Sequence, residues 1–462
     1  MKSLVLAEKP SVARDIARVL GCHKNISGAI EGSNYIVTWA LGHLVTLADP
    51  EEYDKKFKAW DMSYLPMVPK KWELVVIKQT SKQYHNVKTQ LFRKDVSEII
   101  IATDAGREGE LVARWILDKS GCHKPIRRLW ISSVTDKAIK EGFAHLKDGR
   151  SYNDLYHAAR SRAEADWLVG INATRALTCK YNAQLSCGRV QTPTLAIIAH
   201  REQQIRSFKP EDYYGLRCTT SVTGGSVGTM ASIVTWTWQQ KKSGSLRSFN
   251  KDLITGLDKK LKNQTLTVTD VHTSSKRTPS PGLYDLTELQ RDANKRFGFS
   301  AKETLNIMQS LYEHHKVLTY PRTDSRYIGT DIVPTIKERL KACNIGPYKK
   351  YIPELLKKPL KTSKAFVDDK KVSDHHAIIP TEEYVQMEHM SNNERKIYDL
   401  VVRRFISVLY PAFEYEQTTL KAEAADETFT AKGKVIKAAG WKAVYADAAS
   451  SGFSASQYDA YG

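Results

Sequence analysis

Residues 98–110 read Glu-Ile-Ile-Ile-Ala-Thr-Asp-Ala-Gly-Arg-Glu-Gly-Glu, an apolar strand-like run that leads directly into a cluster of acids. A helical pattern follows at 109–119. Apolar runs at 3–7 and 35–40, with a helical pattern at 11–20 between them, give the preceding chain the same alternation. This alternation predicts an α/β domain with a mostly parallel sheet. The acids of residues 104–110 are then expected at the carboxyl end of a strand, where open α/β sheets bind ligands.

The rest of the chain predicts further domains, because 462 residues exceed one ordinary core. A helical pattern at 152–206 is followed by Thr-, Ser- and Val-rich runs that indicate antiparallel strands. A Pro/Ser/Gly-containing linker at 276–282 precedes a second helical block, and β-like character returns after about residue 383. We therefore expect an α/β domain at 1–145, a helical domain at 146–211, the first part of a β-rich domain at 212–278, an inserted helical domain at 279–384, the return part of the β-rich domain at 385–445, and a poorly ordered tail at 446–462.

The composition indicates a polyanionic partner. The formal charge is +19 and the pI is near 9.4, and neutralising phosphates releases counterions that drive association. The other interpretation is that the lysines only keep the surface soluble. No apolar run approaches the ~20 residues that span a bilayer, and the N-terminus does not resemble a secretory signal, so we expect a cytoplasmic protein. The six cysteines form no C-x-x-C pair, which predicts free thiols and no zinc site.

The acidic stretch predicts a metal site. Asp104 and Glu108 follow one strand, and Glu8 follows the first strand of the chain in the same way. Such carboxylates can hold Mg²⁺, and Lys9 offers a cation for a phosphate. The other interpretation is a helix start with solvated acids, which are common near helix N-termini because of the helix dipole.

A second site is indicated at Tyr320, which stands directly before Pro321. A residue before proline favours an extended backbone, which can present the phenol rather than pack it. In an extended chain Arg322 faces the same side, so both side chains can address one phosphate. A phenol with a pKa near ~10 needs such a cation to attack phosphorus. A packed aromatic is the alternative interpretation of the same residue.

Several motifs together resemble type IA DNA topoisomerases of the topoisomerase III subtype. The resemblance covers about residues 1–445 and rests on Glu8-Lys-Pro-Ser11, Ala40-Leu-Gly-His-Leu44 and Asp104–Glu110, which are similar to the Toprim domain of that family, and on the stretches 159–172, 186–195, 283–313, 319–325 and 373–381. It implies a Toprim α/β domain joined to the helical and β-rich arch domains of a toroid. The family pattern D-x-D-x-E is interrupted here, because Gly106 stands where the middle acid is expected.

The resemblance also implies roles for particular residues. The implied catalytic residues are Tyr320, Arg322, Glu8, Lys9 and His375, the implied Mg²⁺ ligands are Glu8, Asp104 and Glu108, and the implied DNA-binding residues are Arg189, Gln191, Thr192, Arg162 and Arg175. Two alternatives stay open. Arg162 and Asp166 can form a helix-surface ion pair at i,i+4 instead of binding phosphate, and Trp167 suits core packing better than base stacking.

The function implied is an ATP-independent topoisomerase that breaks one strand through a 5′-phosphotyrosine, passes a strand and reseals, relaxing negative supercoils and decatenating DNA. The absence of a G-x-x-x-x-G-K-[ST] loop agrees with ATP independence. The expected partners are single-stranded and negatively supercoiled DNA, and we expect a monomer at the bacterial nucleoid. Known members continue beyond the region matched here, so we also consider a truncated, inactive fragment that only binds single-stranded DNA. A third hypothesis is another Toprim enzyme, such as a primase or nuclease.

Overall fold

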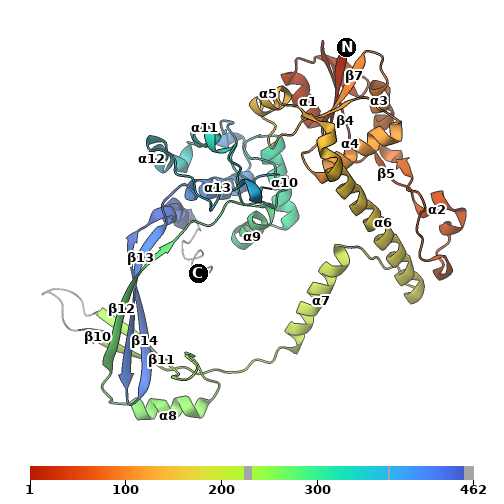
Figure 1. The fold of residues 1–462 in the computed structure, drawn as a ribbon. Helices are drawn as coiled ribbons and strands as arrows, with labels where there is room; N and C mark the ends of the chain where they lie inside the picture. Colours follow the sequence, from red (N-terminus) through yellow and green to blue (C-terminus); the bar gives the residue numbers. More distant parts are fainter. Residues whose placement is uncertain (223–231, 373–374, 452–462) are drawn as a thin grey trace. The chain divides into compact units, whose positions relative to one another are not determined.

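The structure is a computed structural model that describes residues 1–222, 232–372 and 375–451 (Figure 1). The chain divides into two compact units, and each is built from two separate segments. Unit 1 comprises residues 1–199 and 282–409, and unit 2 comprises residues 200–281 and 410–462.

Unit 1 contains a seven-stranded sheet with the order β2-β3-β4-β1-β7-β8-β9. The central strand β1 is parallel to both β4 and β7, and β7 is parallel to β8, whereas the pairs toward the edges are antiparallel. The strands of this sheet are β1 (Lys2–Ala7), β2 (Lys24–Ile26), β3 (Ala29–Glu31), β4 (Tyr35–Trp39), β7 (Val96–Ala102), β8 (Ile126–Arg128) and β9 (Lys147–Asp148), and a separate pair is formed by β5 (Val45–Leu47) and β6 (Leu74–Val76).

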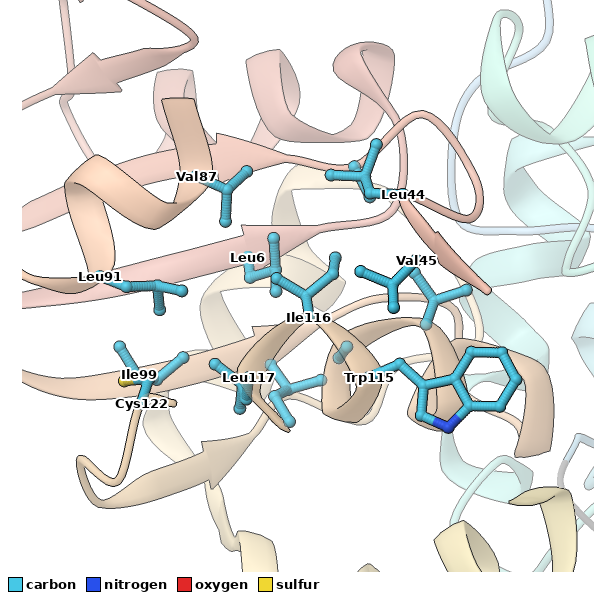
Figure 2. Close-up of a cluster of buried hydrophobic side chains, with 14 of the residues drawn as sticks. Leu6, Leu44, Val45, Val87, Leu91, Ile99, Trp115, Ile116, Leu117 and Cys122 are labelled. Carbon is cyan, nitrogen blue, oxygen red and sulfur yellow. The ribbon is translucent and has the colours of Figure 1, made fainter. Parts of the chain in front are cut away.

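Helices cover both faces of this sheet, because alternate residues of each central strand point to opposite sides. Leu4, Leu6 and Ile99 belong to one core, which also holds buried residues of α3 (Ser81–Leu91) and α4 (Arg107–Ser120). Figure 2 shows this core, with Leu6 and Ile99 near Ile116 and Leu117. Val5 and Ile100 belong to the opposite core, against α1 (Pro10–Val19) and α5 (Asp136–Ala144). The central strands are buried on both faces, which explains their nearly continuous apolar sequence.

The remaining helices of unit 1 lie around this α/β core and in the segment 282–409. They are α2 (Pro50–Tyr53), α6 (Asn153–Tyr181), α9 (Leu286–Phe297), α10 (Ala301–Glu313), α11 (Ile336–Ala342), α12 (Ile352–Lys357) and α13 (Asn392–Ser407), and α7 (Gln191–Ser207) spans the boundary between the units. The helix α13 begins with a capping box, in which Ser391 and Glu394 satisfy each other's backbone N–H groups.

Unit 2 is an antiparallel sheet with the order β10-β11-β14-β13-β12. Its strands are β10 (Arg217–Val222), β11 (Ser232–Gln239), β12 (Thr267–Thr278), β13 (Phe413–Ala424) and β14 (Glu427–Ala438). Figure 1 shows β12, β13 and β14 as long ribbons that lie side by side. One end of the sheet has a core of Trp236, Trp238 and Phe429, which Ile254 and Leu257 of α8 (Lys251–Leu261) complete.

Two expectations need correction. Residues 385–409 were expected to begin the β-rich return, but they contain α13 and belong to unit 1. Residues 276–278 were expected in a linker, but they extend β12 and pair with Tyr415, Glu414 and Phe413 of β13. In the expected tail, the 3-10 helix η9 (Gly440–Ser451) reaches residue 451, and residues 452–462 lie outside the described residues.

Within the part of the chain that the structure describes, we find no helix that is both long and apolar enough to cross a membrane. All six cysteines are free in the same part of the chain.

Candidate active site

Glu8 and Asp104 lie side by side at the carboxyl edge of the sheet. The register pairs Ala7 with Ala102, so the residues that follow β1 and β7 leave the sheet together. The backbone N–H of Asp104 donates to Oε2 of Glu8 at 3.1 Å. Burial and the neighbouring charge of Asp104 raise the pKa of Glu8 to about 7. Burial also raises the pKa of Asp104, although the charge of Lys9 acts in the opposite direction. This edge therefore holds two crowded acids, and Glu8 can carry a proton near neutral pH.

A close backbone approach positions Asp104. The first turn of α4 lies directly against the loop, and a Cβ built on Gly109 would come within 2.1 Å of the Asp104 carbonyl oxygen. The hydroxyl of Thr103 donates to the Gly109 carbonyl at 2.7 Å and ties the end of β7 to the helix. Only glycine fits at this contact, which explains one residue of the acidic motif.

A buried arginine supports the same loop. Arg128 of β8 is fully buried, and its guanidinium donates to the carbonyls of Thr103 at 2.8 Å and Asp104 at 2.7 Å. Its charge is balanced by Glu110, which is also fully buried, at 3.0 Å. Arg128 is a site residue that no motif in the sequence predicted. The signal that could have identified it is an arginine in an apolar strand, because a buried charge needs a dedicated partner.

Tyr320 reaches the acids from a segment 216 residues away in sequence. Its hydroxyl donates to Oδ2 of Asp104 at 3.2 Å, and its backbone N–H donates to the Ser132 carbonyl at 3.1 Å. The ring lies edge-on to Tyr312, with the centroids 5.5 Å apart. Burial and the carboxylates of Asp104 and Glu8 raise the pKa of Tyr320 above its ordinary value, and the charge of Arg322 opposes them. The phenol is therefore protonated and already in contact with a proton acceptor.

His375 covers the other side of the phenol. The two rings stack with their centroids 4.2 Å apart and an interplanar angle of 30°. Burial and neighbouring His376 lower the pKa of His375 to about 4, so its imidazole is neutral at physiological pH. Among the described residues, buried Nδ1 of His375 has no hydrogen-bond partner. The expected residues Ser373 and Asp374 beside it lie outside the described residues.

The two expected phosphate cations differ in their surroundings. Lys9 forms an ion pair with Glu313 of α10 at 2.5 Å, and Gln309 donates to the same carboxylate at 3.0 Å. Arg322 is exposed. Lys9 is thus held in place between the α/β core and α10, whereas Arg322 has a solvent-accessible side chain next to Tyr320.

The three expected metal ligands do not gather. Glu108 lies at the start of α4 with a side chain that is 56% exposed, and it pairs with Arg162 at 2.8 Å. Within the described ranges, no group of three or more His, Cys, Asp or Glu side chains is close enough to hold a metal ion. Glu8 and Asp104 remain as two adjacent carboxylates. This donor set suits Mg²⁺, which commonly binds one or two protein carboxylates and completes its shell with water and phosphate oxygens.

The expected DNA-binding residues differ in how much of each is exposed to solvent. Arg162 and Arg189 are exposed, and both approach Asp166: Arg189 at 2.5 Å and Arg162 at 3.8 Å. Gln191 and Thr192 are exposed at the start of α7. Arg175 is different, because only 6% of it is exposed and its guanidinium donates to the Phe57 carbonyl. Arg175 is therefore a supporting residue in this structure rather than a surface that DNA could reach.

Trp167 packs within the protein. Its ring lies edge-on to Trp72, at a centroid distance of 5.3 Å, and to Tyr53, at 5.8 Å. Its indole N–H donates to the Ala48 carbonyl at 2.9 Å. Of the two alternatives considered for this residue, the structure agrees with core packing.

Comparison with known proteins gives the family. The Toprim domain model matches residues 3–134, and the DNA topoisomerase model matches residues 150–456. The chain belongs to the DNA topoisomerase family. The expected type IA class and the expected fold, an N-terminal Toprim domain followed by topoisomerase core domains, are confirmed.

Relatives of this topoisomerase chain include the DNA topoisomerase 3 proteins of two Bacillus species. The Bacillus cereus protein is 63% identical over 444 residues, which are 96% of this chain and 59% of that protein. The Bacillus subtilis protein is 60% identical over 444 residues, which are 96% of this chain and 60% of that protein. Full-length topoisomerase I from Thermotoga maritima has a similar fold, with a TM-score of 0.68, 23% identity, and coverage of 96% of this chain and 67% of that one. The chain thus spans about 59% of the length of the Bacillus cereus protein and about 60% of the Bacillus subtilis protein.

Proposed function

We propose that this chain cuts one strand of DNA by attack of Tyr320 on a phosphodiester, as part of an ATP-independent topoisomerase reaction. The observation that carries this proposal is the hydrogen bond from the Tyr320 hydroxyl to Asp104, because it joins a candidate nucleophile to the acidic edge of the Toprim sheet. Family membership supports the same reaction class. A Toprim nuclease or primase would not require this tyrosine.

The contacts suggest how the proton and the bonds move. The phenol proton passes to Asp104, the bond from Tyr320 Oη to phosphorus forms, and the bond from phosphorus to O3′ breaks. The leaving oxygen takes a proton from neutral Glu8, whose raised pKa suits this transfer. The broken strand then carries a 5′-phosphotyrosine and a free 3′ hydroxyl. Attack by that hydroxyl reverses each step, so no nucleotide is consumed.

The neighbouring side chains orient and stabilise the reacting groups. Arg322 brings positive charge toward the phenol, and Lys9 brings a second cation to the same edge. His375 holds the phenol ring by stacking, and a phosphate beside its unsatisfied Nδ1 would favour the protonated imidazole, in which Nδ1–H donates to a phosphate oxygen. Such preorganised groups contribute most where charge develops during the reaction.

Magnesium fits the carboxylate pair. Asp104 and the ionised form of Glu8 would hold Mg²⁺, and Glu108 would join them only by giving up its ion pair with Arg162. A bound Mg²⁺ would neutralise charge on the phosphate. Glu8 cannot ligate a metal and donate a proton in the same protonation state, so the two roles belong to different steps.

The proposed substrates are single-stranded and negatively supercoiled DNA, and the proposed outcome in the whole protein is relaxation and decatenation. The exposed Arg162, Arg189, Gln191 and Thr192 are the proposed contacts to the DNA backbone. We further propose that the protein acts as a monomer in the bacterial cytoplasm, at the nucleoid. Names of the relatives, DNA topoisomerase 3, support the reaction class.

A second candidate function is a single-stranded-DNA-binding chain without strand passage. Two observations favour it. The chain spans only about 59% of the length of its Bacillus cereus relative, and Gly106 stands where the family pattern has an acid. A plasmid assay separates the two functions. If the chain is a complete enzyme, it converts negatively supercoiled plasmid to a ladder of relaxed topoisomers with Mg²⁺, and Tyr320→Phe abolishes the ladder. DNA binding without any ladder would instead support the second function.

A further inference from the structure

The segment Asp54–Trp72 is an aromatic and basic surface that none of the proposed catalytic residues uses. Its 19 residues contain five lysines and two carboxylates, with four aromatic side chains interleaved among them. The 3-10 helix η1 (Lys55–Lys58) begins the segment, and η2 (Met62–Tyr64) follows it. Both carboxylates accept backbone hydrogen bonds, Asp54 from Lys56 and Asp61 from Ser63. Lys56 also pairs with Asp54 at 3.1 Å, and five lysines against two carboxylates leave the segment a net charge of +3.

Side chains of α6 clamp this segment in place. Asn172 accepts from the Met67 N–H at 2.6 Å and donates to the Met67 carbonyl at 2.9 Å. Arg175 donates to the Phe57 carbonyl and, at 3.5 Å, to the Ala59 carbonyl. Trp167 contacts Trp72 at the far end of the segment. The segment is thus fixed to a long helix from one end to the other, although most of it lacks regular secondary structure.

Trp60 is the side chain that this clamp presents. The guanidinium of Arg175 lies over the indole, 5.1 Å from the ring centroid, while 51% of Trp60 remains exposed. A largely buried arginine therefore supports the ring from one side, and solvent reaches the rest. Lys58 and Lys55 lie two and five residues before Trp60, and both are exposed. An immobilised, half-exposed indole with lysines beside it combines the two features that bind single strands, a flat aromatic face and nearby cations.

We propose that Trp60 stacks against an unpaired base of single-stranded DNA while Lys55 and Lys58 contact its phosphates. This inference rests on the proposed function, because it assigns a binding subsite for the strand that the enzyme cuts. The lysines favour a nucleic acid over a protein partner, because a protein-binding aromatic patch is usually depleted in lysine. Arg175, expected from its sequence to touch DNA, acts here through the indole that it supports.

The test is a binding titration with a labelled oligothymidine in a Tyr320→Phe background, so that no cleavage occurs. Trp60→Ala should weaken binding about 5- to 100-fold. Trp60→Phe keeps an aromatic face and should stay within about fivefold of the parent. The matched control is Phe92→Ala, which removes an aromatic side chain that is 52% exposed at the end of α3 and should leave binding unchanged. Circular dichroism of each variant checks that it is folded.

Two further readouts identify what is being bound. An oligonucleotide of abasic sites should bind the parent and Trp60→Ala equally, because it has no base to stack. The double variant Lys55→Gln/Lys58→Gln should lower the slope of log K against log salt by about 1.4, whereas Trp60→Ala should leave that slope unchanged.

The outcomes separate this inference from the proposed function. If the parent sequence with Tyr320 intact forms an adduct with DNA but Trp60→Ala binds oligothymidine as tightly as the parent, the stacking site is wrong and the cleavage proposal stands. If no adduct forms but Trp60-dependent binding is found, the cleavage proposal fails and the stacking site stands. A parent chain that binds no single-stranded DNA overturns both.

Discussion

The Tyr320 side chain contacts Asp104, His375 and Tyr312. Asp104 accepts a hydrogen bond from the hydroxyl, and the ring stacks on His375. His375 is neutral and lies close enough to orient the phenol, yet its buried Nδ1 lacks a partner among the described residues. An unsatisfied buried nitrogen is costly unless a ligand completes it. We propose that a phosphate oxygen of the bound strand is this partner, accepting from Nδ1–H once the phosphate favours the protonated imidazole.

His375→Ala should slow single-turnover cleavage of a labelled oligonucleotide by about 100-fold, because it removes both the ring that positions Tyr320 and one hydrogen bond to the phosphate. Binding of the oligonucleotide should change much less. The control is His314→Ala, which removes an exposed histidine just after α10. Equal cleavage rates for His375→Ala and the parent chain would contradict the role given to His375.

The second histidine predicts a pH dependence of stability. Burial lowers the pKa of His376 from 6.5 to about 4, and its Nδ1–H donates to the Ala377 carbonyl. The unfolded chain therefore binds a proton between pH 6.5 and 4 that the folded chain does not. Keeping His376 neutral therefore costs no free energy of unfolding above about pH 6.5. Below that pH the folded protein loses stability progressively until the pH reaches about 4. Urea unfolding at pH 7 and at pH 5 measures this loss of stability. The free energy of unfolding should fall by about 2 kcal/mol less in His376→Asn than in the parent between these two pH values. Parallel pH profiles would count against a buried, neutral His376.

Among the secondary-structure elements, the connection from β7 to α4 determines where Asp104 lies in the site. The strand delivers Asp104, and the helix begins so close behind it that residue 109 must be glycine. Arg128 then fixes the carbonyls of the same loop from β8. The position of the carboxylate is thus set by packing between a strand, a loop and a helix, rather than by the acid itself.

Gly109→Ala should destabilise unit 1 by about 1–3 kcal/mol and reduce cleavage, because the new methyl group would collide with the Asp104 carbonyl. Gly106→Ala is a matched control in the same loop. Gly106 has a φ of 173°, and among the described residues nothing lies within 4 Å of a Cβ placed there. Gly106→Ala should therefore lower the free energy of unfolding by less than about 1 kcal/mol. Urea unfolding of both variants tests this, and equal stabilities would show that the close contact is not as tight as described.

The β13–β14 hairpin of unit 2 carries a separate local strain. Its two turn residues, Ala425 and Asp426, both have positive φ angles of 45° and 64°. A left-handed conformation disfavours alanine by about 1–2 kcal/mol, whereas asparagine tolerates it. Ala425→Asn should therefore stabilise unit 2 by about 0.5–1 kcal/mol, measured by urea unfolding of the whole chain. Ala424→Asn, one residue earlier in β13, should not stabilise it. A loss of stability in Ala425→Asn would mean that the turn adopts another conformation.

Sequence patterns predicted most strongly those features that depend on neighbours along the chain. Sequence patterns identified the apolar runs of β1 and β7 and the acids that follow them, because a strand buried on both faces requires a nearly continuous run of apolar residues. The sequence did not predict which face of α6 is exposed to solvent. Arg162 and Arg175 look alike in sequence, but only the packing of residues 54–72 against the helix shows that Arg175 is buried. Glu108 was grouped with Glu8 and Asp104 by spacing, yet its side chain turns to Arg162 instead.

At the scale of the whole molecule, the residues proposed for cleavage all belong to unit 1. The two segments of that unit bring the Toprim acids and Tyr320 into contact, whereas unit 2 is an antiparallel sheet with its own core. The proposed cleavage step therefore uses residues of unit 1 alone. The chain spans about 59% of the length of its Bacillus cereus relative.

Covalent trapping tests directly whether Tyr320 cuts the DNA strand. The chain is incubated with single-stranded DNA carrying an internal ³²P label and Mg²⁺, then denatured, and the protein is examined for attached label. We expect labelled protein with the parent chain, with a phosphotyrosine recovered from the peptide that contains Tyr320 and a free 3′ hydroxyl on the released fragment. Tyr320→Phe should give no adduct, while Tyr312→Phe, which alters the neighbouring phenol, should retain it. Label that persists in Tyr320→Phe, or that is recovered from another residue, would contradict the account.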